Sequence, residues 1–259
     1  DYLFNEGLKF FKISILEQIN EDSIDILYEI NPIRPKYVNI INIFGNTRTL
    51  EKVIRRELGF AEGDPINSDL IASATKNLQR LNIFKNVEVK ENFFNDEKSN
   101  IDIFLEETST GDFTVGASFE SIDGAVLVAG LDEKNIGGTG RSVSLNINTS
   151  DRNTLYSFNV KEPHFNNKKM NLIYGLKYQN NDFSESSSYN LNSAISNIGI
   201  EYDLIDNLLH NLSLSYELRD YEISDRSTVS SSILSSEGTN SVIKINNLLQ
   251  YNKLNSFLR

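Results

Sequence analysis

The sequence predicts an α+β module followed by antiparallel strands of a transmembrane β-barrel. Apolar residues recur at helical spacing within residues 50–81, whereas from Asp112 onward they alternate at every second position. Many of these alternating runs are about ten residues long, which is the length that a barrel strand needs to cross a bilayer. Short and long connections also alternate between the runs, as expected when turns on one side of a membrane are tight and loops on the other are long.

Composition excludes several classes of protein. The chain has 259 residues, enough for two domains, and a net charge of −11 spread over both halves, which argues against binding to nucleic acid. It contains no cysteine, so neither a disulfide framework nor a thiolate metal site is expected. No window approaches the ~18 consecutive apolar residues of a transmembrane helix, although a barrel strand needs apolar residues only at alternate positions.

Residues 1–34 are expected to form two strands. The first is an apolar run over residues 10–16, and the second alternates at Ile24, Ile26, Tyr28 and Ile30. A break with two prolines follows at residues 31–35. Because this piece is too short to bury a core alone, we interpret it as the C-terminal part of a preceding module.

Residues 35–107 predict one compact β-α-α-β-β module that begins with a strand over residues 37–44. The first helix is expected to start near Thr49 as its N-cap, with Glu51 in the first turn, where the helix dipole favours an anion. Its buried stripe is Leu50, Val53, Ile54 and Leu58.

The second half of this module contains another helix and two strands. The helix is expected to start near a capping Ser68, with a buried face formed by Leu70, Ile71, Ala74, Leu78 and Leu81. A strand over residues 84–90 and a last strand over residues 101–105 follow. The polar segment 92–100 between them is expected to be a mobile hairpin loop.

Residues 108–259 predict about eight antiparallel strands of the N-terminal half of a barrel. The clearest alternation sets Met170, Leu172, Tyr174, Leu176 and Tyr178 against polar neighbours. A soluble β-sandwich also alternates, but its strands usually have only about five or six residues. The tyrosines near strand ends also resemble the aromatic girdle of a membrane barrel. The pattern therefore favours a barrel over a sandwich.

No catalytic, cofactor-binding or metal site is predicted. Gly137-Gly138-Thr139-Gly140 lacks the Lys-Ser/Thr ending of a phosphate loop and precedes a strand, so a β-turn is expected. His164 and His210 are the only histidines, and nothing indicates convergent partners for a zinc site or a catalytic triad. We therefore expect that the protein is not an enzyme and needs no cofactor.

The motif Gly45-Asn46-Thr47-Arg48-Thr49, followed by Arg55-Arg56-Glu57-Leu58 and Glu62-Gly63-Asp64-Pro65, resembles the last POTRA module of the BamA family. The run Glu162-Pro163-His164-Phe165 is also similar to that family. The resemblance implies a part of a longer protein, with its last POTRA module in the periplasm and the first half of its barrel in the bacterial outer membrane. The implied function is assembly and insertion of β-barrel proteins, with unfolded outer-membrane proteins, assembly lipoproteins and outer-membrane lipid as partners.

The resemblance also implies three sets of functional residues. The POTRA edge strand would bind extended client segments by β-augmentation through Lys85, Asn86, Val87, Glu88, Val89 and Lys90. The acidic loop at Glu62 would contact the adaptor lipoprotein BamD. Arg55 and Arg56 are further candidate contacts of the adaptor, although the pair fits either an anionic partner or a solvated helix face. The first barrel strand would form a weak lateral seam through Phe113, Thr114, Val115, Gly116, Ala117, Ser118 and Phe119.

Two other functions are compatible with the pattern. The first is a secretion pore of the same superfamily that exports one dedicated partner. The second is a soluble, β-rich binding protein, in which the alternating apolar rows would pack inward against a second protein layer.

Overall fold

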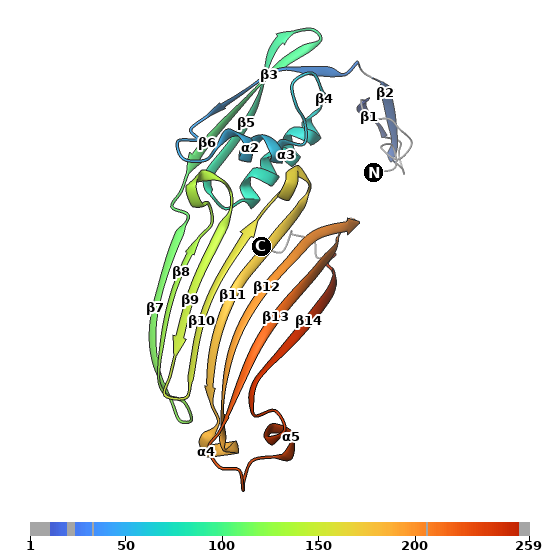
Figure 1. The fold of residues 1–259 in the computed structure, drawn as a ribbon. Helices are drawn as coiled ribbons and strands as arrows, with labels where there is room; N and C mark the ends of the chain where they lie inside the picture. Colours follow the sequence, from blue (N-terminus) through green and yellow to red (C-terminus); the bar gives the residue numbers. More distant parts are fainter. Residues whose placement is uncertain (1–10, 20–23, 33, 206, 254–259) are drawn as a thin grey trace. The chain divides into compact units, whose positions relative to one another are not determined.

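The computed structural model describes residues 11–19, 24–32, 34–205 and 207–253 (Figure 1). The chain divides into two units, with the boundary between Thr108 and Ser109. In the first unit, strands β1 (Phe11–Ile19) and β2 (Ile24–Pro32) pair antiparallel as a two-stranded sheet. These are the two strands expected in residues 1–34, of which residues 1–10, 20–23 and 33 lie outside the described residues.

The rest of the first unit is a four-stranded sheet with two helices. In the sheet the order is β4-β3-β6-β5, with β3 and β6 parallel and the other neighbours antiparallel. The elements are β3 (Lys36–Phe44), α2 (Glu51–Leu58), β4 (Pro65–Ile66), α3 (Ser68–Arg80), β5 (Phe84–Asn95) and β6 (Lys98–Glu107). The predicted β-α-α-β-β order is confirmed, and the two-residue β4 is an addition, formed where the sequence indicated only a turn.

One core holds this sheet and its helices together. Val53, Ile54 and Leu58 of α2 are almost completely buried, as are Ala74 and Leu78 of α3. They belong to one hydrophobic cluster with the alternating Ile101, Ile103 and Leu105 of β6. Helical spacing in two segments and period two in the strand thus supply the facing surfaces. Each fully buried aliphatic side chain contributes about 1.5–3 kcal/mol relative to an exposed one.

Both predicted helix caps are displaced by one position. Leu50 occupies the N-cap of α2 and makes no capping side-chain hydrogen bond, so the expectation for Thr49 was wrong. The reason is that the N–H of Thr49 donates to Glu107 Oε1 at 2.7 Å, which draws Thr49 away from the helix end. In α3, the N-cap is Asn67, whose Oδ1 accepts from the N–H of Leu70 at 2.8 Å, while Ser68 is the first helical residue.

The predicted mobile loop over residues 92–100 is instead a tight hairpin. β5 continues to Asn95 and β6 resumes at Lys98. Asn95 Oδ1 accepts hydrogen bonds from the N–H groups of Glu97 and Lys98, at 3.0 and 2.8 Å. An Asn side chain that satisfies backbone groups two and three residues later favours a tight turn, which explains why a polar segment stays in the sheet.

The second unit is an eight-stranded antiparallel sheet in which each strand pairs with the next along the chain. This confirms the predicted partial barrel of about eight strands. The strands are β7 (Gly111–Glu120), β8 (Gly124–Glu133), β9 (Ser142–Thr149), β10 (Asn153–Glu162), β11 (Met170–Asp182), β12 (Tyr189–Ile205), β13 (Leu208–Ile223) and β14 (Gly238–Tyr251).

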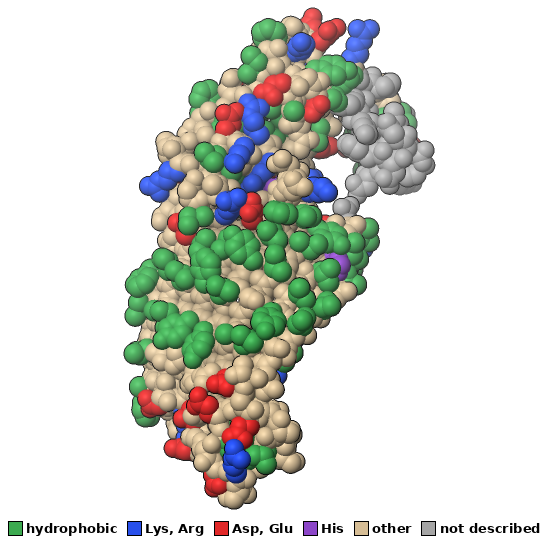
Figure 2. Space-filling view, in the orientation of Figure 1, with side chains coloured by type: hydrophobic (Ala, Val, Ile, Leu, Met, Phe, Trp, Pro, Cys, Tyr) green, Lys and Arg blue, Asp and Glu red, His purple; other side chains and the backbone are tan. Residues whose placement is uncertain are grey.

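The two faces of this sheet differ in chemistry. The register places the apolar alternating residues on one face, here called the outer face, where Leu176 is 60% exposed and Phe113 is 74% exposed. Figure 2 shows these side chains as a band across the sheet. The opposite, inner face carries charge pairs, among them Lys161 with Glu201 at 2.6 Å and Lys244 with Glu217 at 2.6 Å. The pattern of a sheet with an apolar outside and a polar inside fits a membrane barrel.

The predicted alternation of tight and long connections is wrong in part, because the β8–β9 connection has eight residues, 134–141, and the β11–β12 connection only six, 183–188. The β8–β9 turn contains the 3-10 helix η1 (Ile136–Gly138), and the predicted turn at Gly137-Gly138-Thr139-Gly140 places all three of its glycines at positive φ. The two connections predicted to be long contain short helices that the sequence did not reveal, α4 (Ser184–Ser187) and α5 (Ser231–Leu234). No helix among the described residues is both long and apolar enough to cross a membrane.

We expect Gly45→Ala to destabilise the first unit strongly. Gly45 has φ +89°, and a Cβ added there would lie 1.9 Å from the carbonyl oxygen of Leu105, so the β3 end and β6 would have to separate. Overpacking against backbone costs about 3 kcal/mol or more. Hydrogen–deuterium exchange of the β3 and β6 amides in the intact protein measures the loss.

Gly59→Ala is the matched control for this substitution. Gly59 also has positive φ, +75°, but no atom lies within 4 Å of the added Cβ. It should lose only the left-handed preference of glycine, about 1 kcal/mol. Equal exchange in the two variants would contradict the close approach of Gly45 to Leu105.

Candidate functional site

Strand β5 lies at the edge of the four-stranded sheet, where the predicted client-binding residues are found. Within the described residues its single strand neighbour is β6, and Glu88 lies opposite Phe104 in the register. Alternate backbone N–H and C=O groups of an edge strand therefore point away from the sheet. Such groups can pair with any extended segment, because the backbone is the same in every sequence.

The side chains of β5 divide between core and solvent. Val87 is buried, and Val89 packs against the core. Lys85, Glu88 and Lys90 are exposed, with Lys85 paired to Glu106 at 2.7 Å and Lys90 paired to Glu88 at 3.0 Å. Charged side chains on an edge oppose uncontrolled strand pairing, so this edge is protected against aggregation although its backbone is open.

Strand β7 occupies one edge of the eight-stranded sheet and contains all of the predicted seam residues. Its one neighbour among the described strands is β8. On its outer face Phe113, Val115 and Phe119 are exposed by 74%, 68% and 82%. Both its apolar side chains and one side of its backbone therefore lack cover within the described chain.

Gly116 is in the middle of β7, opposite Val128 of β8. No atom lies within 4 Å of a Cβ added to Gly116, so nothing in the described structure requires glycine at this position for space. Glycine in a strand interior lowers strand stability because it has more freedom to lose and no side chain to pack. Gly116 therefore lowers the stability of β7, as Gly130 does in β8 and Gly175 in β11.

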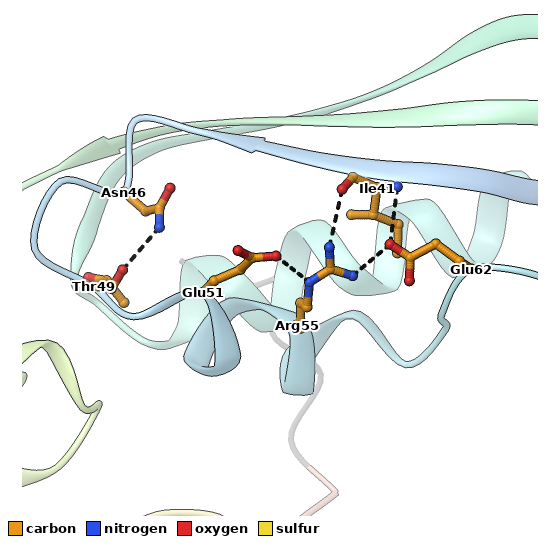
Figure 3. A network of polar contacts seen from close by, with 6 residues as sticks. All are labelled: Ile41, Asn46, Thr49, Glu51, Arg55 and Glu62. Carbon is orange, nitrogen blue, oxygen red and sulfur yellow. Dashed lines mark hydrogen bonds and ion pairs between the residues drawn. The ribbon is translucent and has the colours of Figure 1, made fainter.

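Arg55 is held inside the module by three contacts (Figure 3). Its Nε donates to Glu51 Oε1 at 2.5 Å, its Nη1 to Glu62 Oε1 at 2.8 Å, and its Nη2 to the carbonyl oxygen of Ile41 at 3.3 Å. Glu62 Oε1 also accepts from the N–H of Ile41 at 3.4 Å. Arg55 thus joins α2, the end of the acidic loop and β3, a role that the sequence did not reveal.

This network has a clear electrostatic signature but a modest energy. Hydrogen bonding from Arg55 lowers the pKa of the Glu62 carboxyl, and hydrogen bonds to Glu51 and Glu62 raise the pKa of Arg55. The Arg55 and Glu62 side chains are 35% and 40% exposed. At this exposure the pair contributes at most about 1 kcal/mol, so its main effect is to orient Glu62.

Arg56 lies in a different environment from Arg55. Its side chain is 20% exposed, and its Nε is 3.5 Å from Glu57 Oε1. Among the three residues predicted to contact an adaptor, Glu62 therefore presents the most exposed side chain, and Arg56 the least. The structure brings Arg55 and Glu62 together and does not bring Arg56 into their network.

Glu107, the last residue of β6, anchors the loop before α2. Its carboxylate accepts from Thr47 Oγ1 at 2.8 Å and from the N–H groups of Arg48 and Thr49 at 3.0 and 2.7 Å. Burial raises the pKa of Glu107, but these hydrogen bonds outweigh burial and hold the pKa below its usual value of 4.5. The motif that led to the family resemblance is therefore a structural loop, closed by a carboxylate sixty residues away.

Comparison with known families identifies both units. The POTRA family, described as surface antigen variable number repeat, matches residues 36–108, and the Omp85 superfamily domain matches residues 135–259. The chain carries a POTRA module and an Omp85 superfamily domain. The strands of the Omp85 domain lie in the bacterial outer membrane, and the POTRA module lies in the periplasm.

Curated relatives agree with this assignment. The outer membrane protein assembly factor BamA of Neisseria meningitidis serogroup B is 29% identical over 172 residues, which are 65% of this chain and 22% of that protein. The BamA of Neorickettsia risticii is 23% identical over 249 residues, 95% of this chain and 34% of that protein. The resemblance found from the motifs is confirmed, and the chain spans only about a fifth and a third of the lengths of these two relatives.

Solved structures share the fold. The crystal structure of Haemophilus ducreyi BamA lacking POTRA domains 1–3 matches 98% of this chain and 51% of its own chain, with a TM-score of 0.69 at 21% identity. CdiB from Acinetobacter baumannii matches 97% of this chain and 49% of its own, with a TM-score of 0.61 at 16% identity. The fold of this chain is therefore shared by BamA and CdiB.

We expect Glu107→Gln to destabilise the POTRA module by about 1 kcal/mol at neutral pH, because hydrogen bonds to a charged acceptor are stronger than those to a neutral one. The folded pKa of Glu107 is depressed, so its stabilisation is present above the unfolded pKa and is lost as the pH falls through the folded pKa. The difference between variant and parent should therefore shrink in acid. Amide exchange of residues 46–50 at neutral and acidic pH measures it, with Glu106→Gln, one residue earlier and 55% exposed, as the control.

If Glu107→Gln and Glu106→Gln were equally protected at both pH values, the anchoring role of Glu107 would be refuted.

Proposed function

We propose that this chain is part of an assembly factor that receives unfolded β-barrel proteins in the periplasm and templates their insertion into the outer membrane. The observation that carries the proposal is the position of β7, which is an edge strand of a membrane sheet with one neighbour in the described chain. The relatives that carry the name of an outer-membrane assembly factor support the same function.

The first step of the proposal is capture in the periplasm. A client segment pairs as an added strand with the outward backbone groups of β5. The charged side chains of Lys85, Glu88 and Lys90 remain exposed beside it and impose little selection on the client sequence. Affinity comes from main-chain hydrogen bonds, so many different unfolded clients are accepted.

The second step is transfer to β7. Each unpaired backbone group in hydrocarbon costs several kcal/mol, so an edge strand in a bilayer must find a partner. An incoming client strand supplies these partners and is itself satisfied by the same bonds. The transfer exchanges one strand pairing for another, and we propose that it requires no chemical reaction and no cofactor.

An assembly lipoprotein such as BamD is the proposed partner of the acidic loop at Glu62. Arg55 fixes the carboxylate through Oε1, and the side chain remains 40% exposed. We assign Arg55 the task of positioning Glu62, since all three of its hydrogen bonds are made within the module.

The second candidate function is a secretion pore of the same superfamily, which the likeness of the fold to CdiB keeps open. Copurification with assembly lipoproteins, rather than with one exported protein, distinguishes the two.

A photocrosslinking amino acid at position 88 should capture unfolded outer-membrane proteins in the periplasm. Phe104 lies directly opposite Glu88 in the register but on the interior strand β6, so the same crosslinker at position 104 is the matched control. The yield at position 88 should exceed that at position 104 because β5 has an open edge, whereas β6 lies between β3 and β5. Equal yields would show that the client does not bind by strand addition at β5.

Gly116→Val should slow client assembly about two- to fivefold, since replacing a strand glycine stabilises the strand by about 0.5–1 kcal/mol. A more stable β7 exchanges its partner less readily. The rate at which a radiolabelled client becomes folded in vesicles measures the effect in the full-length protein. Ser144→Val, at an inner-face position of the interior strand β9, should leave the rate unchanged. An unaltered rate in Gly116→Val would remove β7 flexibility from the mechanism.

A further inference from the structure

The outer face of the Omp85 sheet contains a hollow of about 570 Å³ that extends over β9 to β13. Its floor on β12 is formed by two small residues, Ala194 and Ser196. Four large residues face them in register, Leu176 and Tyr178 on β11 and Tyr216 and Leu218 on β13. The hollow therefore deepens where side-chain size changes between neighbouring strands, and it extends across the strands rather than along one of them.

The surface on the two sides of this hollow differs in polarity. On the same face of β12, Ser196 is followed by Ile198, which is 51% exposed. In the other direction Ala194 is followed by Asn192, whose Oδ1 accepts from Asn180 Nδ2 at 2.6 Å and from the Tyr178 hydroxyl at 3.4 Å. The sheet surface therefore becomes polar beside the hollow, on the side toward the connection that contains α4.

The lining of this hollow is unsuited to bound water. A bound water needs two to four polar partners, and the lining is almost entirely apolar. The hollow is continuous with the band of hydrophobic side chains on the outer face (Figure 2), which faces acyl chains in the outer membrane. A chain against a flat wall makes contacts on one side, whereas a chain in this hollow contacts the floor and both walls.

We propose that the hollow over Ala194 and Ser196 is a binding site for one acyl chain of a membrane lipid. Asn180 and Asn192, which lie beside the hollow, offer polar groups to the headgroup of that lipid. In a bilayer such a site is selected by van der Waals fit, because hydrocarbon already surrounds the protein and supplies no hydrophobic driving force. Four strands separate β12 from β7, so a lipid held here remains bound while β7 exchanges partners.

The test uses the full-length protein in vesicles of phosphatidylethanolamine and phosphatidylglycerol, with a trace of phosphatidylethanolamine that carries a diazirine on its acyl chain. Light-induced lipid adducts are then located by peptide mass spectrometry. We expect adducts to concentrate on β11 to β13 rather than to spread evenly over the outer-face residues of all strands.

Ala194→Leu fills the floor and should lower the adducts on β11 to β13 about fivefold, since the acyl chain loses its contacts with floor and walls. Ser196→Leu should act in the same way and serves if the first variant folds poorly, which heat-modifiable gel mobility reports. Ala125→Leu on β8 is the control, because Ala125 is an exposed outer-face alanine opposite Phe119 and lies outside the hollow.

Evenly distributed adducts, or unchanged adducts on β11 to β13 in both folded leucine variants, would overturn the proposal. Absence of lipid adducts at the hollow together with crosslinks to a protein would assign it to a protein partner instead and equally refute it. Because client assembly is not the readout, failure here would leave the proposed insertase function standing.

Discussion

The constraint on which this structure depends is that every backbone N–H and C=O group inside a bilayer needs a hydrogen-bond partner. From β7 through β14, the seven pairings between neighbouring strands satisfy these groups by simple sequential pairing. An alternating sequence then places apolar side chains on the outer face and polar side chains on the inner face. The same constraint applies to β7, because its outward N–H and C=O groups need hydrogen-bond partners that another strand can provide.

In the periplasm, the open edge of β5 has a different consequence, because water surrounds it. Water satisfies the outward groups of β5, so an open edge there is tolerated and its danger is aggregation. The charged Lys85, Glu88 and Lys90 limit that danger. The module is stabilised by its own core and by polar contacts, of which the hydrogen bonds of Glu107 and Arg55 are the clearest examples. None of these contacts uses the outward backbone groups of β5.

The period of the apolar residues predicted much of this architecture, because the buried face of a helix or strand is determined by residues close together in the sequence. The stripe of Val53, Ile54 and Leu58 and the alternation around Tyr174 both appear as expected. Some failures were local, such as the turn made by the Asn95 side chain, but others come from contacts that the local sequence does not encode. Thr49 misses its capping position because Glu107 holds it, and Arg55 is engaged by Glu62 and Ile41, neither of which its helix position reveals. The hollow at Ala194 likewise needs the register of three strands to become visible.

The unequal lengths of the strands have a consequence for the cell surface. β12 has 17 residues and β13 has 16, whereas β7 has 10. At ~3.3 Å per residue and a typical tilt near 45°, a strand of the length of β12 rises ~40 Å, which exceeds the ~25 Å apolar band of an outer-membrane barrel. The excess must lie outside the apolar band, and β11 and β14 remain paired with it near the connections that contain α4 and α5. The connection after β13 is therefore held beyond the lipid headgroups by a stiff, hydrogen-bonded sheet.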